Sequence, residues 1–122
     1  MRLLIVEDNE DVREVASVIV DSLGYRVLGA ADAHEALTLL SRGRGIDLMM
    51  SDIVMSGGID GFELARRARK LRPALPILLI SGFPAEAGSA EACEFPILRK
   101  PYRREELARQ IRAALGEPMA VA

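Results

Sequence analysis

Five short apolar runs, separated by amphipathic stretches, restrict the fold of this sequence more than any other feature. The runs lie at residues 3–6, 25–28, 46–51, 76–80 and 95–99. Runs of this length suit strands, and an unbroken apolar run is typical of a strand that is buried on both faces. Strands that alternate with helices favour a parallel sheet with helices on both sides. The sequence therefore predicts an α/β fold.

The stretches between the runs carry helix signals. They lie at residues 9–23, 33–43, 62–71, 84–94 and 104–115, with apolar residues at helical spacing in most of them. Asp32, with Glu35 three residues later, predicts a capping box at the second stretch. Gly24 and Gly116 stand where helices are expected to end. The stretch at 84–94 predicts a poor helix, because it contains glycine and no large aliphatic side chain.

Composition limits the classes of protein to which the chain can belong. Its 122 residues suit one domain over 1–122, with a core at about 2–116 and a tail at 117–122. The 16 basic and 18 acidic residues nearly balance, so nucleic acid is not expected as a partner. Cys93 has no second cysteine to pair with. The chain lacks the ~20-residue apolar segment of a membrane span, and we expect a cytoplasmic protein.

Charged and hydroxyl side chains follow four of the five predicted strands. Glu7 and Asp8 follow the first strand, Asp52 the third, Ser81 the fourth and Lys100 the fifth. Each of these residues alone is common at such a position, as a helix cap or a solvated side chain. The carboxyl ends of parallel strands share one edge of the sheet, however, so the five side chains are expected to meet there.

Phosphoryl transfer is the chemistry that this set favours. Crowded carboxylates repel one another and raise each other's pKa, and a divalent cation relieves this repulsion. Mg²⁺ prefers one or two carboxylates with waters and phosphate, and Mn²⁺ can substitute for it. Lys100 adds a positive charge, the Ser81 hydroxyl can donate a hydrogen bond, and one Asp can act as nucleophile.

Five motifs match a known family along essentially the whole chain. They are LIVEDN at 4–9, SDIVM at 51–55, DGFEL at 60–64, ISG at 80–82 and RKPY at 99–102. With these motifs, the sequence resembles the CheY-like receiver domain of two-component response regulators. The resemblance implies a flavodoxin-like, doubly wound fold with five parallel strands in the order 2-1-3-4-5. It also implies a cis peptide bond between Lys100 and Pro101.

The resemblance assigns a role to each residue of the predicted site. Asp52 would be the phosphoacceptor, Lys100 the phosphate-binding lysine and Ser81 the switch hydroxyl. Magnesium would be held by Asp8, Asp52 and the backbone carbonyl of Val54, with Glu7 acting directly or through water. The donor would be a histidine kinase or a histidine phosphotransfer protein. A downstream protein would bind the face formed by the stretch at 84–94, the fifth strand and the last helix.

The chain departs from the family pattern at three places. Ser56 replaces the usual proline, and Gly57 with Gly58 lengthens that loop by one residue. Ile97 stands where many receivers carry a switch aromatic residue. Gly82 and Phe83 follow Ser81, where a small alanine and a polar residue are frequent. These departures leave the acceptor unchanged and affect the loop and the route of signalling.

Three function classes are open to a chain with these residues. The favoured class is a phosphoacceptor switch that assists its own phosphorylation and dephosphorylation without being an enzyme in the usual sense. We expect a stand-alone receiver, the alternative being a receiver excised from a hybrid histidine kinase or a larger regulator. An aspartyl-phosphate phosphatase would carry a second Asp at the place of Val54, and a phosphorylation-independent interaction module would lack Asp52 or Lys100. His34 is read as a surface residue, and the basic residues at 66–72 as a solvated face or a partner patch.

Overall fold

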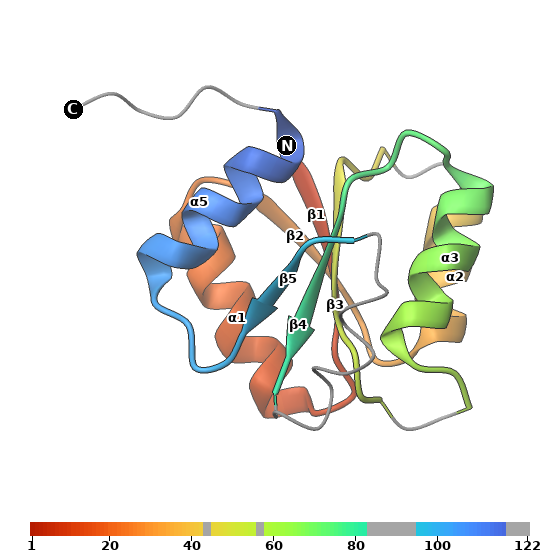
Figure 1. The fold of residues 1–122 in the computed structure, drawn as a ribbon, viewed down its shortest axis with the longest axis horizontal. Helices are drawn as coiled ribbons and strands as arrows, with labels where there is room; N and C mark the ends of the chain where they lie inside the picture. The colour runs from red at the N-terminus through yellow and green to blue at the C-terminus, as the bar shows by residue number, and fades with distance from the viewer. Residues whose placement is uncertain (43–44, 56–57, 83–94, 117–122) are drawn as a thin grey trace.

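A five-stranded parallel sheet forms the centre of the computed structural model, which describes residues 1–42, 45–55, 58–82 and 95–116 (Figure 1). The strands are β1 (Arg2–Val6), β2 (Arg26–Ala30), β3 (Leu48–Asp52), β4 (Ile77–Ser81) and β5 (Ile97–Arg99). They lie in the order β2-β1-β3-β4-β5, and all neighbouring strands are parallel. The predicted fold class and strand order are confirmed.

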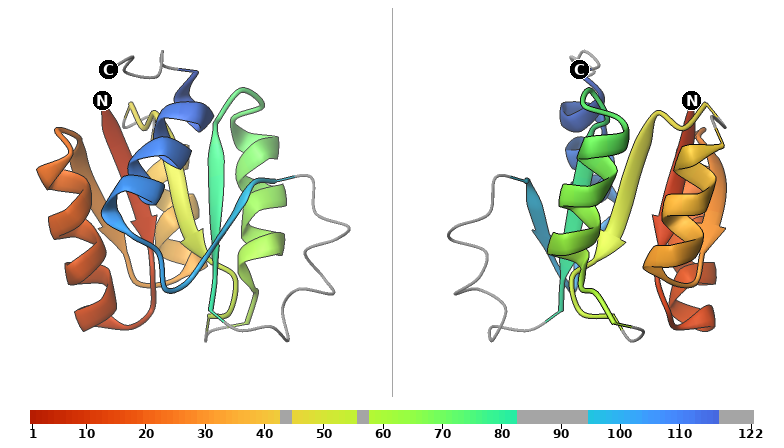
Figure 2. Two further views of the ribbon diagram at one scale, coloured as in Figure 1. Left: turned by 60° about the vertical axis from the view of Figure 1, so that its left-hand side comes forward. Right: turned by 90° about the vertical axis from the view of Figure 1, so that its right-hand side faces the viewer.

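Helices cover both faces of the sheet. They are α1 (Glu10–Ser22), α2 (Ala33–Ser41), α3 (Gly61–Leu71) and α5 (Arg104–Leu115). Figures 1 and 2 show α1 and α5 on one face and α2 and α3 on the other. The predicted helix at 84–94 lies outside the described residues. In the part of the chain that the structure describes, no helix is long and apolar enough to cross a bilayer.

The alternation of side chains along the strands divides the core into two clusters. Leu3 and Ile5 of β1 face α1 and α5, whereas Leu4 and Val6 face α2 and α3. All four side chains are at most 2% exposed. The unbroken apolar runs in the sequence therefore arise because each central strand is covered on both faces.

Three strands differ from their predicted bounds by two residues at one end. β2 continues to Ala30, because β1 extends to Val6 and the two residues are partners in the ladder. β3 begins at Leu48 and contains Asp52, since its ladder with β1 starts at the Leu3–Leu48 pair. β5 begins at Ile97, after Pro96, which has no N–H group to donate to a ladder.

Side-chain caps define the starts of three helices. The carboxamide of Asn9 and the carboxylates of Asp32 and Asp60 accept hydrogen bonds from backbone N–H groups three residues later. The predicted capping box at Asp32 is half confirmed. Glu35 reaches one residue further back than predicted, and its carboxylate accepts from the N–H of Ala31 at 3.4 Å.

Two helix ends on the α1 face have further support. Gly116 ends α5 in the left-handed conformation, with φ of 73°, as its place in the sequence predicts. Arg104, at the start of α5, donates to the backbone carbonyl and the hydroxyl of Ser22, both at 3.2 Å. The last turn of α1 has no basic residue of its own. Arg104 thus brings positive charge to the negative end of the α1 dipole.

The apolar face of α1 is wider than the part that the sheet covers. Ala16 and Val20 are its buried residues. By contrast, the side chains of Val12, Val15 and Val18 are 39%, 61% and 63% exposed. Val12 and Val15 thus share the helical spacing of the buried residues of α1 but lie outside the core. Their exposure leaves an apolar surface beside the C-terminal edge of the sheet.

Candidate functional site

The C-terminal edge of the sheet brings Asp52, Lys100 and Glu7 together. Asp52 ends β3, Glu7 follows β1, and Lys100 follows β5. The ammonium nitrogen of Lys100 lies 3.1 Å and 3.4 Å from the two carboxylate oxygens of Asp52. It lies 3.8 Å from Oε1 of Glu7. One cation therefore faces two carboxylates, as the predicted strand ends require.

Glu7 is a buried acid. The residue is 5% exposed, and its Oε2 has no hydrogen-bond partner among the described residues. Burial, followed by the hydrogen bond and charge of Asp52 and a hydrogen bond with Asp8, raises the pKa of Glu7 to about 8. Lys100 opposes this shift only in part. Near neutral pH the site thus retains a proton that a bound cation would displace.

Lys100 is directed into the site by the backbone that follows β5. Its N–H donates to the carbonyl of Ser81 at 2.7 Å, which extends the pairing of β4 with β5. The Lys100–Pro101 peptide bond is cis, as predicted. Burial lowers the pKa of the Lys100 ammonium, but Asp52 and Glu7 outweigh burial, and the net pKa is raised. Lys100 is therefore charged at physiological pH.

Asp8, Ser81 and Val54 occupy the rim of this site. Asp8 is exposed in the turn that leads into α1, and it shares a hydrogen bond with Glu7. Ser81 ends β4 and is 5% exposed. Val54 follows β3, and its side chain is 63% exposed. Asp8, Ser81 and Val54 thus follow or end the strands at which the sequence analysis placed them. The roles assigned to the three residues stay predictions.

The donor set fits magnesium by its chemistry. Among the described residues, no group of three acidic, histidine or cysteine side chains converges into a complete metal site. Mg²⁺ needs only one or two carboxylates, because it keeps several waters. The buried, unpartnered Oε2 of Glu7 and the adjacent carboxylate of Asp52 provide such ligands. The residues present therefore suit a hydrated, oxygen-bound cation.

Gly61 is a residue of the site that the sequence interpretation passed over. Its N–H donates to the carbonyl of Ile53 at 2.7 Å, so the start of α3 rests on the backbone after β3. A Cβ atom at Gly61 would overlap the carbonyl oxygen of Asp52, and it would lie 2.8 Å from Cα of Ile53 and 3.0 Å from the carbonyl carbon of Asp52. Gly61 follows the cap residue Asp60, and a glycine at the first helical position was the available signal.

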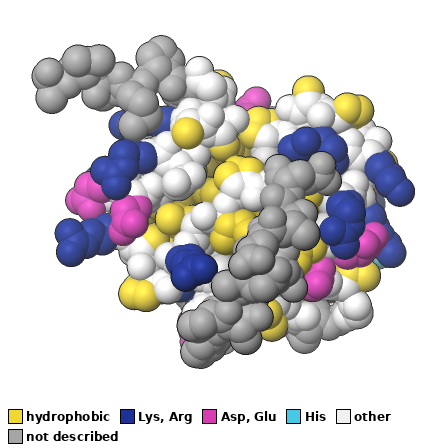
Figure 3. All heavy atoms as spheres, in the orientation of Figure 1, with side chains coloured by type: hydrophobic (Ala, Val, Ile, Leu, Met, Phe, Trp, Pro, Cys, Tyr) yellow, Lys and Arg dark blue, Asp and Glu magenta, His cyan; other side chains and the backbone are white. Residues whose placement is uncertain are grey.

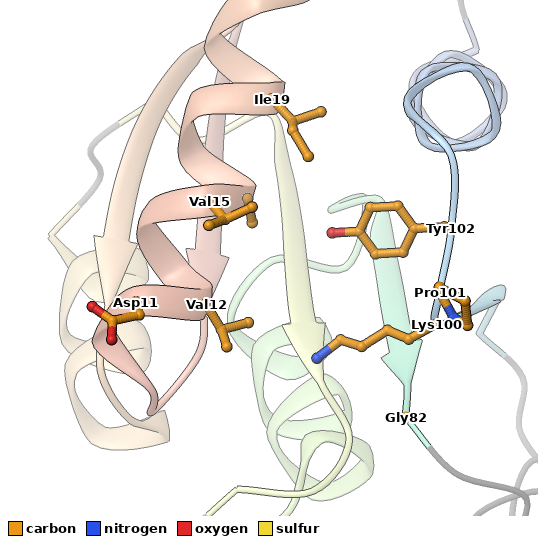
Figure 4. A pocket seen from close by; sticks show the side chains of 9 residues that line it. Asp11, Val12, Val15, Ile19, Gly82, Lys100, Pro101 and Tyr102 are labelled. Atoms are coloured by element: carbon orange, nitrogen blue, oxygen red, sulfur yellow. The ribbon is translucent and has the colours of Figure 1, made fainter.

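An apolar groove of about 620 Å³ opens beside Lys100, between α1 and the chain that follows β5. Figure 4 shows Val12, Val15 and Ile19 projecting from α1 toward the ring of Tyr102, whose hydroxyl points back at α1. Burial raises the pKa of the Tyr102 hydroxyl, so Tyr102 is neutral at physiological pH. The groove thus joins the exposed valines of α1 to the edge of the sheet that carries Asp52 and Lys100.

The predicted basic face lies on α3. Figure 3 shows dark blue Lys and Arg side chains on the side of the molecule where α3 lies, with acidic side chains beside them. Glu63 forms ion pairs with Arg66 and Arg67 at 3.2 Å and 3.0 Å. Arg69 lies over the ring of Phe95, with 5.1 Å between the guanidinium carbon and the ring centroid. Internal contacts thus engage much of this face, and the choice between a solvated face and a partner patch stays a prediction.

Comparison with known proteins identifies the family. A family model described as the response regulator receiver domain matches residues 3–112. The chain belongs to this family. Receiver domains are components of two-component regulatory systems, where they act as phosphoacceptor switches. They generally bind Mg²⁺ at an acidic pocket and interact with histidine kinases and downstream effectors.

The relatives include both short and long proteins. The receiver protein CpdR of Brucella abortus is 33% identical, over 93% of this chain and 96% of CpdR. The sensor kinase CckA of Brucella abortus is 32% identical over 93% of this chain, which spans only 12% of CckA. The crystal structure of a CckA receiver domain matches with a TM-score of 0.77 and 34% identity, covering 94% of this chain and 99% of that one. A receiver protein from Sinorhizobium medicae matches with a TM-score of 0.85 and 26% identity, covering 95% and 94%.

Proposed function

We propose that this receiver takes a phosphoryl group from a phosphohistidine donor onto Asp52, in a reaction that depends on Mg²⁺, and that the phosphorylated form binds a downstream partner differently. The observation that carries this proposal is the position of Asp52. Its carboxylate lies 3.1 Å from the Lys100 ammonium at the end of a central strand. It faces the buried acid Glu7, which would be a second oxygen ligand for a cation.

The chemistry follows from these positions. A carboxylate oxygen of Asp52 attacks phosphorus, the phosphorus–nitrogen bond to the donor histidine breaks, and the imidazole leaves with a proton from solvent. Lys100 offsets negative charge on the transferred group, and the Ser81 hydroxyl donates a hydrogen bond to it. A magnesium ion held by Glu7, Asp8, Asp52 and the Val54 carbonyl would supply further positive charge.

Two features favour a switch over an aspartyl-phosphate phosphatase. Val54 stands two residues after Asp52, where such a phosphatase needs an acid/base group. Its side chain is 63% exposed and offers an attacking water no hydrogen bond. Slow loss of the phosphoryl group suits a signal that must persist long enough to be read. We therefore propose a phosphoacceptor that assists its own dephosphorylation only weakly.

The groove beside Lys100 supports a protein as phosphoryl donor. Exposed Val12 and Val15 give it an apolar wall, and Lys100 at one end places its occupant next to Asp52. A phosphohistidine carried by a helix could bury its apolar neighbours there while its ring reaches Asp52. The proposed donor is a histidine kinase or a histidine phosphotransfer protein. The chain would act as a stand-alone receiver, with a domain of a hybrid histidine kinase as the alternative.

The output surface is proposed at the β5 edge of the sheet. It comprises residues 84–94, which lie outside the described residues, together with β5 and α5. Ser81 at the end of β4 pairs with Arg99 of β5. A movement of Ser81 toward a phosphoryl group would therefore act on this surface directly. Ile97 is half-buried in β5, so the signal would not require rotation of an aromatic ring.

Intact mass spectrometry tests the acceptor. With acetyl phosphate and Mg²⁺ or Mn²⁺, the wild type should gain the mass of one phosphoryl group, and D52N should gain none. D21N is the matched control, because Asp21 is an exposed acid on α1, and it should be labelled like the wild type. Undiminished labelling of D52N would refute the assignment.

A charged substitution in the groove tests the protein donor. V15D should slow transfer from an autophosphorylated histidine kinase by on the order of 10-fold or more, the usual effect of losing an interface anchor. Phosphorylation by acetyl phosphate should be unchanged. L71D is the matched control, because Leu71 is a 50% exposed aliphatic residue on α3. Equal slowing by V15D and L71D would contradict docking at the groove.

A further inference from the structure

Arg13 reaches back from the first turn of α1 to the end of β1. Its Nη1 atom donates to the backbone carbonyl of Glu7 at 2.8 Å. The residue is anchored in the helix by its own N–H, which donates to the carbonyl of Asn9 at 2.9 Å. The hydroxyl of Ser17 donates to the carbonyl of Arg13 at 2.7 Å. A partly buried guanidinium thus connects α1 directly to the residue that precedes Asp8.

Gly29 of β2 provides the seat for this side chain. A Cβ atom at Gly29 would lie 3.3 Å from Cδ, 3.5 Å from Nε and 3.9 Å from Cγ of Arg13. Gly29 is paired with Ile5 in the parallel ladder, and the Ile5 side chain faces α1 and α5. The Cα atom of Gly29 therefore faces the same two helices. The backbone of Gly29 is not in the left-handed region. The glycine therefore serves as space for the stem of Arg13.

Both polar groups of the Glu7 backbone are held as a result. Its N–H donates to the carbonyl of Ala30 at 3.1 Å, and its carbonyl accepts from Arg13 at 2.8 Å. The Glu7 carbonyl belongs to the peptide unit that leads into Asp8. Fixing this unit fixes the direction in which the carboxylates of Glu7 and Asp8 leave the chain. The guanidinium contacts the backbone of Glu7, so it affects the directions of the two carboxylates through that backbone.

We propose that Arg13, seated on Gly29, is a positioning residue that orients the Glu7–Asp8 turn for binding a divalent cation. This role rests on the proposed function, because it concerns the cation that assists phosphorylation of Asp52. Partners that orient metal ligands without touching the metal are worth about 10- to 100-fold in metal affinity. Because Arg13 holds a backbone carbonyl instead of a ligand side chain, we expect the lower end of that range.

Calorimetric titration with Mg²⁺ alone tests the role without requiring phosphorylation. R13A should raise the dissociation constant for Mg²⁺ about 10-fold. R13K should recover part of the loss, since one N–H donor is enough for the Glu7 carbonyl. G29A should weaken binding in the same direction by less, because the stem of Arg13 must shift by a few tenths of an ångström. R26A is the matched control, since Arg26 is an exposed arginine on β2, the strand that also carries Gly29. R26A should bind Mg²⁺ like the wild type.

Metal-free melting separates positioning from simple structural support. If Arg13 positions the turn, the Mg²⁺-induced rise in melting temperature shrinks in R13A more than the metal-free melting temperature falls. Wild-type affinity for Mg²⁺ in R13A would overturn the role; if R13A does not fold, wild-type affinity in both R13K and G29A would do so. If the wild type nevertheless binds Mg²⁺ and is phosphorylated on Asp52, only the role of Arg13 would be refuted and the proposed function would stand. Absence of Mg²⁺ binding by the wild type would overturn the proposed function and this role together.

Discussion

Replacement of Gly61 by alanine should damage both the stability of the fold and the acceptor site. The new Cβ atom would lie 2.8 Å from Cα of Ile53 and 3.0 Å from the carbonyl carbon of Asp52. The carbonyl oxygen of Asp52 would lie closer still. Ordinary contacts between carbon atoms begin at about 3.5 Å, so the start of α3 must retreat by at least about 0.7 Å. Its neighbours are backbone atoms at the end of a central strand, which cannot move aside as a flexible side chain could.

The expected cost follows from two terms. Inserting a methyl group into a filled space costs about 1–3 kcal/mol. The hydrogen bond from Gly61 to the Ile53 carbonyl, at 2.7 Å, would be stretched or lost, at about 1 kcal/mol. Alanine favours helix over glycine by up to about 1 kcal/mol, which offsets part of the loss. G61A should therefore lower the free energy of unfolding by about 1–3 kcal/mol.

Two assays decide the outcome. Urea unfolding should show the stability loss, and acetyl phosphate labelling should be slowed by up to about 100-fold, because a displacement near 1 Å at a reacting group has effects of this size. G82A is the control substitution for stability, since a Cβ atom at Gly82 meets nothing within 4 Å. The reasoning is refuted if G61A unfolds at the same urea concentration as the wild type and is labelled at the same rate.

Three further predictions concern the acids, the lysine and the loop after β3. Glu7 has a pKa raised from 4.5 to about 8, so the folded state holds its proton more tightly than the unfolded state. The contribution of Glu7 to the free energy of unfolding of the metal-free protein should therefore be largest below about pH 4.5, and it should fall by a few kcal/mol as the pH rises toward 8. E7Q should remove this pH dependence, as measured by urea unfolding. K100Q should slow labelling by acetyl phosphate on the order of 100-fold, while the K70Q control, on the exposed face of α3, should be labelled normally. V54N should shorten the lifetime of the phosphorylated form several-fold, because the amide can hydrogen-bond an attacking water; an unchanged decay followed by intact mass would count against the role of Val54.

The sheet and the acidic edge could be predicted because their signals are local. Unbroken apolar runs identify strands covered on both faces, and parallel pairing then brings Glu7, Asp52 and Lys100 to one edge. The start of the second helix was equally readable, since Asp32 caps it with its own side chain. Each of these features can be predicted from the order of residues within a short segment of the sequence.

The remaining features depend on distances between segments that are remote in sequence. The exposure of Val12 and Val15 could not be predicted from helical spacing, which gives the direction of an apolar face but not the width of the surface that covers it. The need for a glycine at position 61 arises from the approach of α3 to the β3 backbone. Likewise, Gly29 has no local signal, because its neighbour Arg13 comes from another element.

The bond between Arg104 and Ser22 has a consequence for the order of events during synthesis. The two residues are 82 positions apart, so α1 leaves the ribosome long before the side chain that meets its last carbonyl has been made. Chains are synthesised from the N-terminus at about 5–20 residues per second, which leaves the end of α1 without this partner for roughly 4–16 seconds. During that interval the last turn of α1 must rely on its own hydrogen bonds and on water. The first helix of this domain is thus completed only after the start of α5 has been translated.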